Sequence, residues 1–218
     1  MRIHNIEQRT YEWHLIKHGV IGGTLAKGLF VKSDTLLIDL LSQKLEEFDY
    51  EESYISFDMQ RGIDLEPQAR EELSREIFVQ FNEVGFIQHE TIDILGISPD
   101  GISDDHTIQC EIKCPAAKKH TSTILADEIH SDNIHQVLHA FVVNEKLESL
   151  FFCSYRPENK IKPLWYKEIK KDSLIDLGTK SKPQVKSVSE WKDIALNEAK
   201  QLQEDIDSAI DKLKNLYQ

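Results

Sequence analysis

The clearest hydrophobic pattern of the chain is a strict alternation of polar and apolar residues from Thr107 to Lys113. Successive side chains of a β-strand point to opposite faces, so the alternation predicts a strand with one polar and one apolar face. The two faces would carry Thr107, Gln109, Glu111 and Lys113 on one side and Ile108, Cys110 and Ile112 on the other. Just before it, Ser98-Pro99-Asp100-Gly101 is typical of a turn. A hairpin between the two would bring Asp100 beside Glu111.

Apolar residues at three- and four-residue steps predict the helices. The expected helices are 10–17, 33–47, 65–84, 131–145 and 189–217. Thr10 is a typical N-cap residue for the first of them. In the third, Pro67 would lie in the first turn, with Glu66 at its beginning and Gly85 as the glycine that ends it. Residues 116–128 are expected to form a loop or a short helix.

Segments rich in β-branched and aromatic residues predict the remaining strands. These are 86–97, as a strand pair or one bent strand, 148–155 and 162–170. Residues 48–57 are interpreted as an acidic loop and 180–183 as a polar linker. The expected fold class is α/β, with a central mixed sheet flanked by helices and a long amphipathic C-terminal helix over 184–218. That helix could pack on its own domain or on a neighbouring subunit.

Composition narrows the class of protein. The 218 residues, 40% of them hydrophobic, fit a single domain over 1–218 with a sizeable core. No run approaches the length of a membrane-spanning helix, and the first residues lack the apolar core of a signal peptide. Three cysteines are too few for a disulfide framework or a four-cysteine iron–sulfur cluster. We therefore expect a cytoplasmic protein.

The net charge of −12 is unusual for a protein that binds nucleic acid. Charge can be segregated on a surface, however, and one local basic cluster is expected at Lys113, Lys118, Lys119 and His120. His135 and His139 have a spacing that could suit zinc. They lack the glutamate of an H-E-x-x-H motif, so we expect both to be partly exposed or to face DNA.

Asp100, Glu111 and Lys113 together suit metal-dependent phosphate chemistry. Two close carboxylates repel each other unless a cation lies between them. Mg²⁺ favours one or two carboxylates together with waters and phosphate oxygens. The lysine could position the attacking water or stabilise charge on the phosphate. Singly, a turn aspartate and an exposed Glu-x-Lys ion pair are common structural features, so the ordered combination carries the hypothesis.

The spacing Asp100…Glu111-x-Lys113 resembles the signature of the PD-(D/E)xK nuclease superfamily. Further blocks occur in order, and together they resemble the lambda-exonuclease-like, YqaJ-type viral recombinase nucleases. These blocks are Gln8-Arg9-Thr10-x-Glu12-Trp13-His14, Gly19-Val20-Ile21, Arg61-Gly62-x-x-Leu65-Glu66-Pro67-x-Ala69-Arg70, Ser98-Pro99-Asp100-Gly101, Glu111-Ile112-Lys113-Cys114-Pro115, His135-Gln136-Val137 and Ser154-Tyr155-Arg156-Pro157. The resemblance covers most of the chain and implies a restriction-endonuclease-like core.

The resemblance implies Mg²⁺-dependent 5′→3′ hydrolysis of linear double-stranded DNA, with Mn²⁺ as a substitute for Mg²⁺. It implies that the metal is bound by Asp100, Glu111 and the backbone carbonyl of Ile112. The other catalytic residues it implies are Lys113, which would position or activate the water, and Glu66 and Gln136, which would support the site. The residues it implies for the terminal 5′ phosphate are Lys17, Thr24 and Ser98.

Lys17 and Thr24 stand where the family has an arginine and a serine, and a lysine lacks the bidentate fork of an arginine. The resemblance further implies 3′ single-stranded tails for an annealing protein, a trimeric ring around the DNA and, for a phage-encoded protein, the cytoplasm of a bacterial host. Two alternatives stay open. One is an endonuclease or a single-strand-preferring nuclease on the same fold, and the other is a catalytically inactive module that binds DNA ends or proteins.

Overall fold

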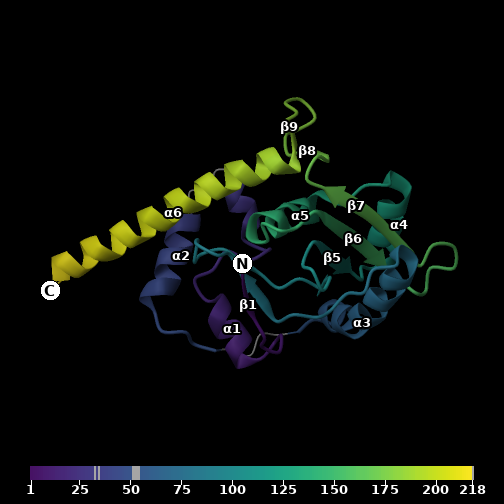
Figure 1. Ribbon diagram of the computed structural model, residues 1–218, viewed down its shortest axis with the longest axis horizontal. Helices are drawn as coiled ribbons and strands as arrows, with labels where there is room; N and C mark the ends of the chain where they lie inside the picture. Colours follow the sequence, from purple (N-terminus) through teal and green to yellow (C-terminus); the bar gives the residue numbers. More distant parts are fainter. Residues whose placement is uncertain (32, 34, 51–54, 218) are drawn as a thin grey trace.

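The computed structural model describes residues 1–31, 33, 35–50 and 55–217, and Figure 1 shows their arrangement. A four-stranded sheet lies at the centre, in the order β4 (Gly101–Ile102), β5 (Ile108–Lys113), β6 (Ser149–Tyr155) and β7 (Leu164–Lys170). The strands β5 and β6 pair in parallel, and the other two pairings are antiparallel. The sheet is therefore mixed, and the predicted α/β class is confirmed.

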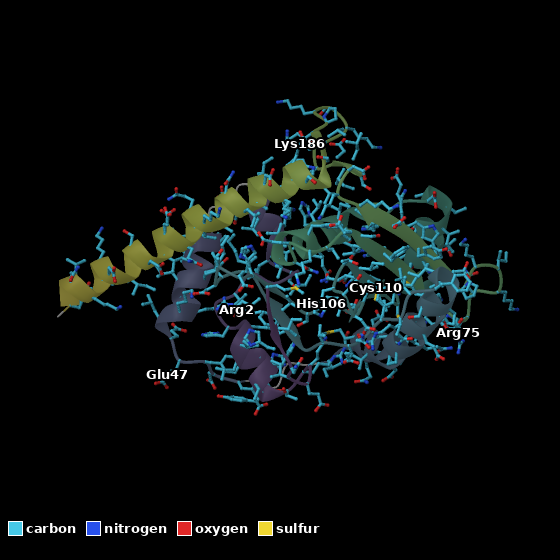
Figure 2. The ribbon with its side chains drawn as sticks, viewed as in Figure 1. Arg2, Glu47, Arg75, His106, Cys110 and Lys186 are labelled. Atoms are coloured by element: carbon cyan, nitrogen blue, oxygen red, sulfur yellow. The ribbon has the colours of Figure 1, made fainter. Side chains whose placement is uncertain are left out.

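Helices cross between the two parallel strands, because a parallel pair needs a long connection. The connection contains α4 (Ala117–Ala126) and α5 (Ser131–Val143). Helix α5 is buried against the main core, which includes Val137, Phe141 and Phe152. On the opposite face, Cys110 and Ile112 of β5 pack with Ala69 and Leu73 of α3 (Phe57–Ile77). Figure 2 places Cys110 within the body and Arg75 of α3 at its periphery.

A second, three-stranded sheet joins the two ends of the predicted 86–97 segment to the start of the chain. It runs β1 (Arg2–His4), β2 (Phe86–Gln88), β3 (Gly96–Ile97), all antiparallel. The expected strand pair is thus confirmed, whereas β1 was not predicted. Between β1 and α3 the chain forms α1 (Tyr11–Lys17), the short 3₁₀ helix η1 (Ala26–Leu29) and α2 (Leu36–Leu45). Helix η1 packs on α5 and α6, and α2 packs on α6.

Helix α3 differs from its prediction at both ends. It begins at Phe57, where the Ser56 side chain accepts a hydrogen bond from the Met59 N–H, so Pro67 and Glu66 lie in its interior. It ends at Ile77, and the next residue, Phe78, caps it with a left-handed φ of 57°. Gly85 therefore caps no helix; a Cβ there would lie 1.9 Å from the Ile6 carbonyl oxygen, so the glycine is needed for a close backbone approach.

The C-terminal part contains a hairpin and a long helix. The predicted polar linker at 180–183 is instead the turn between β8 (Leu174–Asp176) and β9 (Val185–Ser187). Helix α6 (Val188–Tyr217) follows and packs on α2, α5 and η1. Figure 1 shows its far end extending past the body. Among the described residues, no helix combines the length and the apolar character that crossing a membrane requires.

The other predicted segments agree with the structure to within a few residues. Residues 46–50 are irregular, as expected of the acidic loop, but its positions 51–54 lie outside the described residues. The predicted helix 33–47 forms from Leu36 to Leu45, and its position 34 is likewise not described. The loop or short helix expected at 116–128 is α4.

Candidate active site

The hairpin of β4 and β5 brings Asp100 to Glu111, as the alternating pattern predicted. Gly101 pairs with Cys110, and the Ile112 N–H donates to Asp100 Oδ2 at 2.6 Å. Glu111 is only 2% exposed, and the Lys113 ammonium group donates to Glu111 Oε1. A turn carboxylate, a strand carboxylate and a lysine thus lie together at the end of β5.

Burial and the closeness of the charged groups shift the pKa values of Asp100 and Lys113. Burial and the nearby Glu111 raise the pKa of Asp100 to about 7. Burial alone would lower the pKa of Lys113, but Glu111 and Asp100 raise it above its ordinary value. Lys113 is therefore a protonated donor at neutral pH. In this state it can hold a water or a phosphate oxygen, but it cannot accept a proton.

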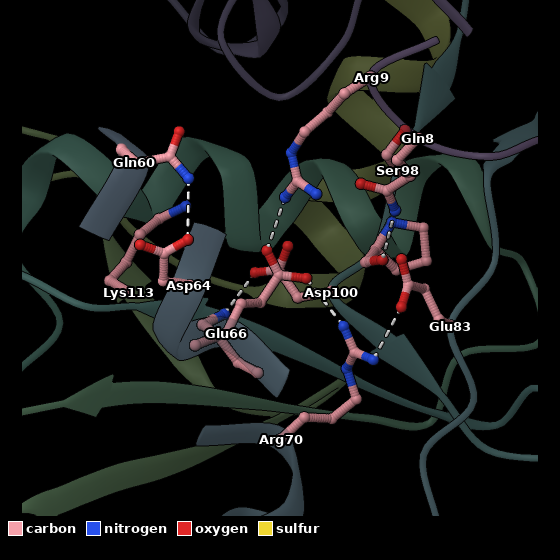
Figure 3. Close-up of polar contacts among 12 residues, drawn as sticks. Gln8, Arg9, Gln60, Asp64, Glu66, Arg70, Glu83, Ser98, Asp100 and Lys113 are labelled. Atoms are coloured by element: carbon pink, nitrogen blue, oxygen red, sulfur yellow. Dashed lines mark hydrogen bonds and ion pairs between the residues drawn. The ribbon is translucent and has the colours of Figure 1, made fainter. Parts of the chain in front are cut away.

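Glu66 joins the same group from the interior of α3. Burial and Asp100 raise its pKa, against the opposing effect of two arginines. Arg9 Nη2 lies 3.0 Å from Glu66 Oε2, and Arg70 Nη2 lies 2.8 Å from Glu66 Oε1. Figure 3 shows the two arginines approaching the acidic group from opposite sides. Both arginines lie in motif blocks of the sequence, but neither was predicted to belong to the site. The i, i+4 spacing of Glu66 and Arg70 on a helix could have suggested their ion pair.

The donor atoms of this group fit a hard divalent cation. The Asp100 and Glu111 carboxylates, together with the Ile112 carbonyl, offer only oxygen atoms as ligands. Over the described part of the chain, no group of three or more His, Cys, Asp and Glu side chains is arranged to hold a metal. Asp100, Glu111 and the Ile112 carbonyl are the residues that could hold a cation, one that keeps several waters and takes phosphate oxygens as further ligands.

Two of the residues expected at a terminal phosphate, Lys17 and Ser98, meet at Trp13. The Lys17 ammonium lies 3.3 Å from the centre of the Trp13 ring. The Trp13 Nε1–H donates to Ser98 Oγ at 2.8 Å, and Ser98 Oγ donates to the Gly85 carbonyl at 2.8 Å. Trp13 thus links Lys17 to the turn that carries Asp100. The Ser98 hydroxyl already has two partners within the chain.

The glycine segment and Gln136 also meet. A Cβ at Gly23 would lie 2.8 Å from Gln136 Cγ, so the glycine allows the α5 side chain to lie on this segment. Thr24 follows in the same turn. Gln136 is accordingly in contact with the loop expected to bind phosphate.

The comparisons with known proteins decide the family. The family described as the YqaJ-like viral recombinase domain matches residues 12–146. The chain belongs to this family. The match includes Glu66, Asp100, Glu111 and Lys113 but stops short of Arg156 and begins after Arg9. No curated protein matches the chain.

Two solved structures of one exonuclease share the fold of this YqaJ-like protein. The alkaline exonuclease LHK-Exo from Laribacter hongkongensis is 24% identical, with a TM-score of 0.70 over 95% of this chain and 100% of its own. The structure of LHK-Exo in complex with dAMP matches equally well. A phage-related exonuclease from Haemophilus somnus 129PT is 10% identical, with a TM-score of 0.48 over 95% of this chain and 97% of its own.

Two histidine predictions for the YqaJ-like protein are wrong. His139 is neither exposed nor directed at DNA; it is fully buried, and its Nε2 lies 2.9 Å from the carbonyl oxygens of both Ile21 and Gly96. His120 does not belong to a basic cluster, because it too is buried, between Ser154 Oγ and the Lys162 carbonyl. Both rings connect separate segments of the core.

Two further arginines hold the chain where β5 ends. Arg61 of α3 donates to the Cys114 carbonyl at 2.8 Å and to both carboxylate oxygens of Glu158. Arg156 donates to the Pro115 carbonyl at 3.1 Å. We name this arrangement the β5-exit clamp. It fixes the backbone directly after Lys113.

Proposed function

We propose that this YqaJ-like protein is a Mg²⁺-dependent 5′→3′ exonuclease that degrades one strand of linear double-stranded DNA. The observation that carries the proposal is the joining of Asp100, Glu111 and a protonated Lys113 at the end of β5, with Glu66 at hand. The product would be a 3′ single-stranded tail, which a single-strand annealing protein could pair with a complementary strand.

The residues divide the chemistry among them. Asp100, Glu111 and the Ile112 carbonyl would hold the cation, which when bound lowers the pKa of a water and neutralises charge on the phosphate. In hydrolysis, a water oxygen bonds to phosphorus, the bond from phosphorus to the 3′ oxygen breaks, and the proton passes to that 3′ oxygen. Lys113, held at Glu111, donates to the water or to a phosphate oxygen as negative charge develops.

The end-binding residues support an exonuclease over an endonuclease. Lys17 and Ser98 are linked through Trp13, and Gln136 lies on the glycine segment next to Thr24. A cation and hydroxyl groups next to the carboxylates would favour a terminal 5′ phosphate. By the family resemblance, we also propose a trimeric ring around the DNA, which size-exclusion chromatography with light scattering would test.

One assay tests the function. Linear duplex DNA, with or without a 5′ phosphate, and closed circular DNA are incubated with the protein in Mg²⁺, in Mn²⁺ and in EDTA. We expect Mg²⁺-dependent loss of linear DNA alone, faster with the phosphate. Lys113→Ala should abolish this loss, whereas Lys214→Ala, which removes an exposed lysine near the end of α6, should not.

The other outcomes name the alternatives. Cutting of the closed circle would replace the exonuclease by an endonuclease, and preferential loss of heat-denatured DNA would indicate a single-strand nuclease. Binding of DNA ends without any cutting would leave an inactive binding module.

A further inference from the structure

Arg9 lies between the two parts of the candidate site. Its Nη2 contacts Glu66 Oε2 at 3.0 Å, next to the carboxylates. Burial lowers the pKa of Lys17, the residue proposed for the terminal phosphate, and the charge of Arg9 adds to this effect. Figure 3 shows the Arg9 side chain reaching toward Glu66 and Asp100. A DNA strand with its terminal phosphate at Lys17 and its next phosphate at the carboxylates would therefore lie close to the Arg9 guanidinium.

The two arginines on Glu66 are not equivalent. Arg70 is 13% exposed and binds Glu66 as well as Glu83, which lies 3.1 Å from its Nη1. Arg9 is 41% exposed, and within the described residues its side chain donates only to Glu66. If Arg9 turned away, Glu66 would keep Arg70 as its partner. The contact between Arg9 and Glu66 can thus be exchanged without leaving a buried charge unpaired.

The backbone holds Arg9 in an unusual conformation between two anchored neighbours. Its φ is +69°, a left-handed value that costs a non-glycine residue about 1 kcal/mol. The Gln8 side chain donates to the Val84 carbonyl at 2.9 Å. Thr10 Oγ1 accepts from the Trp13 N–H at 3.3 Å and caps α1. The strained residue is therefore held by its surroundings, as is common at functional sites.

We propose that Arg9 binds the phosphate to be cleaved, exchanging Glu66 for the non-bridging oxygens of that phosphate. An arginine keeps its charge at any working pH, and its fork of N–H groups matches two oxygens of one phosphate. Its position at Glu66, beside the carboxylates, would place a second cation in addition to Lys113 against the charge that builds up on the phosphate during hydrolysis. The inference rests on the proposed function, because it assigns a residue to the substrate of that site.

Binding to a short 5′-phosphorylated duplex tests the inference without cleavage. We would follow fluorescence anisotropy in Ca²⁺ at several salt concentrations and check that the DNA stays intact. Arg9→Asn removes the charge, and asparagine tolerates the left-handed backbone. We expect Kd to rise about tenfold and the slope of log Kd against log salt to fall by about 1, as for one lost phosphate contact. Arg75→Ala, at an exposed arginine of α3, should change neither.

Repeating the measurement in a Glu66→Gln background separates substrate contact from support of Glu66. If Arg9 touches the phosphate, Arg9→Asn lowers affinity and slope in both backgrounds. An effect that vanishes with Glu66→Gln would overturn the inference and make Arg9 a positioning residue. An unchanged slope in both backgrounds would overturn it too.

Arg9→Lys gives a second variant, should Arg9→Asn lose its thermal transition. It should keep the salt slope, because the charge remains, but lower the single-turnover cleavage rate, because the fork is gone. An unaltered rate in a folded Arg9→Lys protein would contradict the inference. If the wild type cleaves DNA and Arg9→Asn binds DNA with an unchanged Kd and salt slope, the role of Arg9 is refuted and the proposed nuclease stands. If DNA binding depends on Arg9 but the wild type does not cleave DNA, the proposed nuclease activity is refuted and the binding role of Arg9 stands.

Discussion

At the scale of single residues, the environment of each ionisable group sets what it can do. Partial burial of Lys17, together with the charge of the nearby Arg9, lowers the pKa of its ammonium group to about 8. Its ammonium lies over the Trp13 ring, which is a favourable position for a cation. A residue proposed to bind phosphate is therefore only partly charged in mildly alkaline solution.

This gives a pH dependence for end recognition. Because only the protonated lysine attracts phosphate, the preference for 5′-phosphorylated over 5′-hydroxyl DNA should decrease as pH rises from 7 to 9. Lys17→Arg stays charged and should hold the preference nearly constant. The preference is measured as the ratio of the cleavage rates of 5′-phosphorylated and 5′-hydroxyl DNA between pH 7 and 9. An equal fall in wild type and Lys17→Arg would rule out Lys17 as the cause.

His139 gives a second pH effect, on stability. Burial lowers its pKa to about 4, against the partial compensation of two carbonyl groups. Between pH 6.5 and 4 the unfolded chain binds a proton at this residue and the folded chain does not, so stability falls as pH falls, by about 3 kcal/mol over the window. His139→Gln should show a shallower decline in the urea midpoint. Identical declines in the two proteins would refute the assignment.

At the scale of elements, the predictable parts were those with a local signal. The β5 strand and its hairpin follow from alternation and a turn, and they placed Asp100 and Glu111 correctly beside each other. The first turns of α3 were missed, because Gly62 and charged residues interrupt the apolar period there. Its end was missed because Phe78 takes a left-handed conformation without being a glycine. The partners of Arg9 could not be predicted, since Glu66 lies 57 residues away.

The β5-exit clamp allows a prediction at this scale. Arg61→Ala would leave the Cys114 carbonyl without its 2.8 Å partner and free the backbone after Lys113. We expect a loss of about 1–3 kcal/mol in stability. Because small misplacements of a catalytic group are costly, kcat should fall up to about 100-fold with little change in KM. Arg75→Ala on the same helix serves as control, and a kcat equal to wild type would contradict the role of the clamp.

At the scale of the whole molecule, α6 joins parts of the chain that are distant in sequence. It lies on α2, η1 and α5, and its buried side chains belong to the main core. Ile206 is fully buried, whereas Leu216 is 63% exposed near the extended end. The first two-thirds of α6 therefore stabilise the body, and the last turns do not.

Paired substitutions on α6 test this division. Ile206→Ala should lower the free energy of unfolding by about 2–5 kcal/mol, because it removes buried methyl groups and leaves a cavity. Leu216→Ala should change it by less than about 0.5 kcal/mol. Urea unfolding followed by circular dichroism measures both. A comparable loss at Leu216 in dilute protein would show that the end of α6 is covered in solution.

The parallel pairing of β5 with β6 has a consequence for the order of folding. Residues 103–107 close the hairpin between β4 and β5, whereas residues 114–148 must close before β6 can pair. The longer closure costs about 1.7 kcal/mol more in chain entropy. We therefore expect Asp100 and Glu111 to meet early, while the chain is still being made. Strand β5, which carries Lys113, can pair with β6 only after α4 and α5 have left the ribosome. We therefore expect Asp100 and Glu111 to be close together well before the site is complete.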